Sequence, residues 1–83
     1  MFVKISSVTT QPDYILLIEF STGEIKQFDI KPLIISKYPS FKPLTEVHGL
    51  YEQVKIDKDG CGIYWNDNID LSATGLYEQS LSL

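Results

Sequence analysis

The segment Gly62-Ile63-Tyr64-Trp65-Asn66-Asp67-Asn68-Ile69-Asp70-Leu71 carries the densest structural information in this chain of 83 residues. Residues 62–65 are typical of a β-strand, and they end in the only tryptophan. The polar residues 66–68 are typical of a turn, because Asn and Asp side chains hydrogen-bond their own backbone. Asp70 and Ser72 follow, and we expect both to help start a terminal helix. The segment thus predicts how the chain closes its core.

A β-hairpin is predicted directly upstream of the tryptophan. Residues 53–57 alternate apolar and polar side chains, and residues 61–65 are again strand-like. Between them stands Lys58-Asp59-Gly60, and an Asp-Gly pair between two such runs favours a tight turn.

The register of this hairpin sorts its side chains onto two faces. Cys61 shares a face with Ile63 and Trp65, so we expect Cys61 to be buried as a small hydrophobic residue. Tyr64 points to the other face. One member of the Tyr64–Trp65 pair is therefore expected in the core, and the other is a candidate contact for a partner, since Tyr and Trp are favoured interface residues.

A second hairpin is predicted in the first third of the chain. Residues 14–20 form the strongest strand pattern, with apolar residues on both faces, which is typical of a central strand. Residues 2–9 suit an edge strand. Gly23 supplies the positive φ that a turn over residues 21–24 needs before the returning strand at 25–28.

Helices are expected to be short. Asp29 is suited to cap a helix that begins near Pro32, carries Leu33, Ile34 and Tyr38 on its apolar stripe, and ends before Pro39. Residues 39–50 contain two prolines and a glycine, which predicts a loop with one helical turn. A terminal helix is expected through Ala73, Leu76 and Tyr77.

These patterns together predict one α+β domain over residues 1–83. We expect a small antiparallel sheet built from two β-hairpins plus an N-terminal strand, with short helices packed on one face. One cysteine cannot form an internal disulfide, which fits a reducing cytoplasm. Neither a signal peptide nor a membrane-spanning run is apparent, so a soluble cytoplasmic domain is expected.

Charge narrows the class of partner. The net charge is −4, and all seven basic residues are lysines spread among acidic residues. Without arginine the chain lacks the preferred group for bidentate phosphate and guanine contacts. Nucleic-acid binding by this domain alone is therefore not expected.

The residue types and their spacing do not indicate a set of catalytic residues. His48 and Cys61 are a formal nucleophile–base pair, but nothing in the sequence places them together. An alternative is a small-ligand or divalent-metal site, with or without enzymatic activity, at the Asp67–Asp70 corner, because Asp57, Asp59 and neighbouring amides supply oxygen ligands. Turn chemistry explains these acidic residues more simply. No cofactor is expected.

A set of short sequence motifs is spread along nearly the whole chain. In order they are Asp13-Tyr14, Leu16, Phe20, Thr22-Gly23, Phe28-Asp29, Phe41-x-x-Leu44, Tyr51-x-x-Val54, residues 65–71 and Leu76-Tyr77. Their order and spacing resemble the domain of unknown function 2442 family of small bacterial proteins. The resemblance implies a compact α+β domain without known catalytic residues. It also implies a gene neighbour encoding another short protein, in a toxin–antitoxin-type pair. Some relatives carry a helix-turn-helix domain after this one, and residues up to Leu83 contain none.

The leading functional hypothesis is a non-enzymatic protein-interaction module, the antitoxin-like member of such a pair. Its partner is expected to be a small, basic protein, because the chain is acidic. The candidate contact residues are Tyr64, Trp65, Asp67 and Asp70, together with an exposed sheet edge near residues 2–9. The same edge is suited to homo-oligomer formation.

Overall fold

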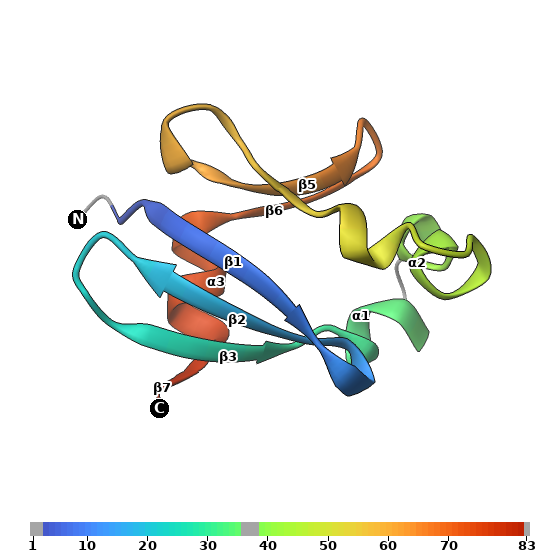
Figure 1. The fold of residues 1–83 in the computed structure, drawn as a ribbon, viewed down its shortest axis with the longest axis horizontal. Helices are drawn as coiled ribbons and strands as arrows, with labels where there is room; N and C mark the ends of the chain where they lie inside the picture. Colours follow the sequence, from blue (N-terminus) through green and yellow to red (C-terminus); the bar gives the residue numbers. More distant parts are fainter. Residues whose placement is uncertain (1–2, 36–38, 83) are drawn as a thin grey trace.

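The structure is a computed structural model that describes residues 3–35 and 39–82. Within these residues the strands form two antiparallel sheets, and with several short helices they confirm the α+β class (Figure 1). The first sheet has the spatial order β1 (Ile5–Gln11), β2 (Ile15–Phe20), β3 (Ile25–Asp29) and β7 (Leu81–Ser82). The second has the order β4 (Lys55–Ile56), β5 (Gly62–Asn66) and β6 (Ile69–Ser72). The hairpins thus lie in two sheets, where one had been expected.

The helices are short. They are α1 (Lys31–Ile35), α2 (Pro43–Glu46) and α3 (Ala73–Gln79). Single 3-10 turns lie in the connections between these elements: η1 (Pro12–Tyr14), η2 (Pro39–Phe41), η3 (Tyr51–Gln53) and η4 (Lys58–Gly60). In Figure 1, α3 lies behind the strands of the first sheet, whereas α1 and α2 lie together at its right-hand end. The helices therefore cover the core on one face of the first sheet, through α3, and at one end of it, through α1 and α2.

Strand β2 is central, as its two-sided apolar pattern predicted. It pairs with β1 on one side and β3 on the other. Leu16 and Ile18 have no exposed surface and Phe20 is 1% exposed, whereas Ile15 and Leu17 on the opposite face are half-buried. One face of the first sheet thus forms the centre of the core, and the other is covered over part of its length.

Local turn chemistry holds the first hairpin and the helix that follows it. Gly23 has a φ of 92°, and its N–H donates to the Phe20 carbonyl at 2.9 Å. The Asp29 carboxylate accepts from the Lys31 backbone N–H at 3.0 Å, which confirms its place at the start of α1. Ile34 is buried on this helix. Tyr38 of the expected helix and residue 2 of the expected edge strand lie outside the described residues.

Residues 39–50 contain two helical turns where one was expected. Each begins at a proline, Pro39 for η2 and Pro43 for α2. A proline fits the first position of a helical turn, because its fixed φ is helical and no N–H is needed there. Each proline in this segment therefore starts its own turn.

The closing segment forms a hairpin that the sequence did not predict. Asn66 accepts from the Asn68 N–H at 2.8 Å through its side chain, and this turn joins β5 to β6. Asp70 lies in β6 and not at a helix start, so its predicted capping role is wrong. Ser72 alone caps α3, its hydroxyl accepting from the Gly75 N–H at 3.1 Å.

One hydrophobic core joins the two sheets. Its members come from both sheets and from the helices, and the half-buried Leu33, Leu71 and Tyr77 pack against it. The buried apolar residues are Val3, Ile5, Leu16, Ile18, Phe20, Phe28, Ile30, Ile34, Phe41, Leu44, Tyr51, Ile63, Trp65, Ile69, Ala73 and Leu76.

Candidate protein-interaction site

Trp65 belongs to the core. It is 5% exposed, and its indole N–H donates to the Tyr51 carbonyl at 2.8 Å. The Tyr51 hydroxyl in turn donates to the Ile15 carbonyl at 2.9 Å. Trp65 and Tyr51 therefore link the second sheet to the first. Of the predicted aromatic pair, Tyr64 is left as the half-buried ring on the outer face.

Cys61 is exposed, so the expectation that it is buried beside Ile63 and Trp65 is wrong. It follows η4 with φ −71° and ψ −13°, which is helical backbone, and β5 begins only at Gly62. The alternation of a strand therefore does not yet apply at Cys61. His48 is also exposed, in the loop after α2.

The predicted polar contacts gather on the outer face of the second sheet. Tyr64 and Asp70 are register partners on β5 and β6, so their side chains share a face. A shallow hollow there is lined by Asp57, Tyr64, Asn66, Asp67 and Asp70. Among the residues that the structure describes, no three Asp, Glu, His or Cys side chains lie close enough to hold a metal ion. The metal-site alternative thus gains no support from this arrangement.

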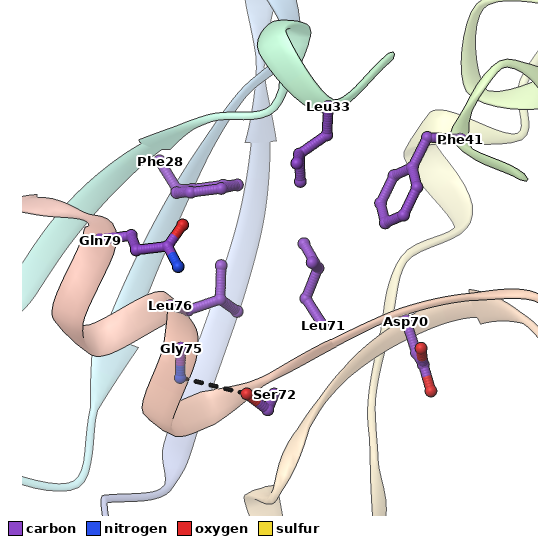
Figure 2. Close-up of a pocket in the computed structure, with 9 residues that line it drawn as sticks. All are labelled: Phe28, Leu33, Phe41, Asp70, Leu71, Ser72, Gly75, Leu76 and Gln79. Carbon is purple, nitrogen blue, oxygen red and sulfur yellow. Dashed lines mark hydrogen bonds between the residues drawn. The ribbon is translucent and has the colours of Figure 1, made fainter. Parts of the chain in front are cut away.

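An apolar groove lies on the other side of β6 (Figure 2). Its cavity has a volume of about 310 Å³. In Figure 2, Leu33 and Phe41 enter it from one side, and Leu71 and Leu76 enter it from the other. The lining residues are Phe28, Leu33, Phe41, Asp70, Leu71, Ser72, Gly75, Leu76 and Gln79. We call this cavity the β6 groove.

The β6 groove continues toward β7. An adjoining hollow of about 460 Å³ shares Phe28, Leu33 and Gln79 with it. Its other lining residues are Ile15, Gln27, Asp29, Pro32 and Leu81. The charged residues that line the two hollows are Asp70 and Asp29, both acidic. The apolar surface is therefore bordered by negative charge.

Strand β6 separates the groove from the acidic face. Figure 2 shows Leu71 pointing into the groove and Asp70 pointing away from the apolar side chains. This follows from strand geometry, because successive side chains point to opposite faces. In the described part of the chain β6 pairs only with β5, so its other edge is unpaired and lies beside the groove.

A second polar cluster holds α3 against the first hairpin. Lys26 is only 8% exposed, and its ammonium donates to the Tyr77 carbonyl at 2.8 Å and lies 3.7 Å from the centre of the Tyr77 ring. The Tyr77 hydroxyl donates to the Glu24 carboxylate. This hydrogen bond lowers the pKa of Glu24 and raises the pKa of Tyr77. We assign this cluster a structural role, because Lys26 and Glu24 each contact Tyr77 of α3.

Sequence reasoning identified Asp70 as a candidate contact but missed the β6 groove. The groove's apolar residues come from β3, α1, η2, β6 and α3, which only the tertiary structure brings together. The one local sign of the groove in the sequence is Leu71, an apolar residue next to Asp70. The residue pattern of this segment predicts a turn and a helix start, and not a strand.

The fold and this surface define a small α+β domain with an open, acidic-rimmed strand edge. A family model described as "Protein of unknown function (DUF2442)" matches residues 5–82, nearly the whole chain. The chain therefore belongs to this family, which confirms the resemblance inferred from its sequence motifs. No curated protein and no solved structure matches the chain. None of the helices in the described ranges is long and apolar enough to cross a membrane.

Proposed function

We propose that this protein is a non-enzymatic interaction module that binds a small basic partner protein. The observation that carries the proposal is the β6 groove, an apolar cavity next to a strand that has one unpaired edge in the described part of the chain. Asp70 lines the groove, and Asp29 lines the adjoining hollow. Apolar clefts on a protein surface are frequent sites of association, because their burial removes apolar area from water.

Charge supports a basic partner. The chain has a net charge of −4, and the charged residues lining the β6 groove, its adjoining hollow and the outer hollow are Asp29, Asp57, Asp67 and Asp70. Complementary charge accelerates encounter and selects against acidic competitors more than it sets affinity. We therefore expect association to be fastest at low ionic strength.

The resemblance to the family supplies a candidate partner. We propose that the protein is the antitoxin-like member of a two-gene pair, whose other member is the short protein encoded by the adjacent gene. Binding would then act by covering a surface of that protein, since the proposed module itself performs no chemistry.

Co-expression of the two gene products tests this function. We expect the neighbouring product to co-purify with the wild-type protein at low salt. The Asp70→Lys variant should weaken the complex by roughly tenfold, because one rim carboxylate becomes a cation. The matched control is Glu46→Lys, which changes the net charge equally at an exposed residue of α2 that lines neither the β6 groove, nor its adjoining hollow, nor the outer hollow. Failure of the wild-type pair to associate at any salt concentration would contradict the proposal.

A further inference from the structure

We infer that the partner binds as an added β-strand along the free edge of β6, through a segment that alternates apolar and basic side chains. This inference rests on the proposed interaction function and specifies the surface and the chemistry of the occupant. It combines two features: an unpaired strand edge, and side chains of opposite character on the two faces of that strand.

The free edge of β6 is accessible. Asp70, Leu71 and Ser72 line the β6 groove, Asp70 and Ser72 are exposed, and no strand in the described residues pairs with this edge. Unpaired N–H and C=O groups on such an edge are a template for another strand. Strand β6 has four residues, so we expect a pairing segment of similar length.

The other sheet edges in the described residues are less suitable. The start of β1 is covered by η4: a Cβ placed on Gly60 would lie 2.8 Å from the Ile5 carbonyl oxygen, so the two backbones are in close contact. Strands β4 and β7 contain only two residues each. The edge near residues 2–9 stays a prediction, and we place the partner strand at the edge of β6.

The two faces of β6 set the side-chain pattern of the partner. Leu71 points into the groove with Leu33 and Phe41, and Asp70 points to the outer face (Figure 2). A strand added beside β6 places its own side chains alternately on the same two faces. One set would fill the apolar groove, and the other would lie beside Asp70.

The outer face favours basic side chains. Asp70 is nearest the free edge, and Asp67 and Asp57 line the same hollow. Lys55 shares this face, but it lies on β4 across β5 from Asp70, because Lys55 pairs with Tyr64 and Tyr64 pairs with Asp70. At roughly 4.8 Å between neighbouring strands, an added strand meets the carboxylate of Asp70 first.

A model peptide tests the pattern directly. The probe is a fluorescein-labelled heptapeptide that alternates lysine and valine, titrated into the full 83-residue protein at low salt and followed by anisotropy and by ¹H–¹⁵N NMR. We expect saturable binding, with amide shifts centred on residues 69–72. A peptide of the same composition with lysines and valines in two blocks should bind roughly tenfold more weakly, because it cannot match both faces.

Backbone methylation separates strand pairing from simple charge attraction. A peptide methylated on every second amide keeps one hydrogen-bonding edge, so at least one of the two such isomers should bind like the parent. A peptide methylated on all amides should lose roughly tenfold or more in affinity, because no strand edge remains. Equal binding of the fully methylated peptide would overturn strand addition.

Variants of the protein complete the test. Asp70→Lys should weaken the alternating peptide by roughly tenfold, and the matched Glu46→Lys variant should stay within about twofold. If the neighbouring gene product co-purifies while the peptide leaves residues 69–72 unshifted, strand addition at β6 is wrong and the interaction function survives. If the neighbouring product fails to associate while the peptide binds at β6, the edge is confirmed and the proposed two-gene partnership is wrong.

Discussion

Replacement of Tyr51 by phenylalanine gives the sharpest test of how the two sheets are joined. The Tyr51 hydroxyl is in a side chain that is 5% exposed, and it donates to the Ile15 carbonyl at 2.9 Å. A net hydrogen bond of this kind contributes about 1 kcal/mol, and an acceptor left without its donor raises the cost to about 1.5 kcal/mol. We therefore expect Tyr51→Phe to lower the free energy of unfolding by that amount at pH 7.

The difference between the two proteins should change sign at high pH. Burial raises the pKa of Tyr51 from 10.0 to about 12. The folded state therefore holds this proton more tightly than the unfolded state, and the resulting stability is complete below pH 10 and is lost as the pH rises through about 12. Between these values the loss is about 1.4 kcal/mol for each pH unit, and the phenylalanine variant does not incur it.

The wild type and Tyr51→Phe should therefore be equally stable near pH 11, and the variant should be the more stable one at pH 12 (values that follow from about 1.4 kcal/mol per pH unit). The assay is urea unfolding followed by far-UV circular dichroism at several pH values, because ionised tyrosines quench the fluorescence of Trp65. Tyr64→Phe is the matched control for the loss of one tyrosine. If the free energies of unfolding of wild type and Tyr51→Phe changed in parallel from pH 7 to 12, the conclusion that the Tyr51 hydroxyl is buried and donates a hydrogen bond would be refuted.

Three further predictions concern the glycines in two turns, the cap of α3 and the cysteine. Gly60→Ala should lower the free energy of unfolding by at least about 2 kcal/mol, because φ is +74° and the new Cβ would lie 2.8 Å from the Ile5 carbonyl oxygen. Gly23→Ala, with a φ of +92° and open space around it, should cost only about 1 kcal/mol; equal losses in urea unfolding would contradict the close contact. Ser72→Ala should lower the free energy of unfolding by about 1 kcal/mol through loss of the α3 cap, and an unchanged thermal midpoint would argue against that cap. Cys61 should react with a thiol-specific reagent in the native protein as fast as in urea, whereas strong protection would indicate the buried position that the structure excludes.

The parts of the fold that were predicted correctly depend on residues close together in sequence. The central position of β2 followed from apolar residues on both of its faces. Gly23 and Ser72 marked a turn and a helix cap, because positive φ and capping hydrogen bonds are properties of a few adjacent residues. Such interactions form in the same way whatever the rest of the chain does.

The candidate site could be predicted only in part. Asp70 was identified because it stands in an unusually polar segment. Its function as the rim of a groove was not visible, since Leu33, Phe41 and Leu76 come from three other elements. The exposure of Cys61 was misread because strand alternation was extended one residue too far into a turn.

The segment 62–71 shows where sequence and tertiary structure each decide. Its sequence by itself determined a strand through Trp65 and a polar turn, and the following Ser72 determined a cap for α3, because turn chemistry, alternation and capping are local. Only the tertiary structure decided that residues 69–72 form β6 in a second sheet and that Trp65 donates to the Tyr51 carbonyl. It also decided that, among the described strands, β6 pairs with β5 alone. These outcomes depend on which distant surfaces pack together, since burial and strand pairing are properties of the assembled core.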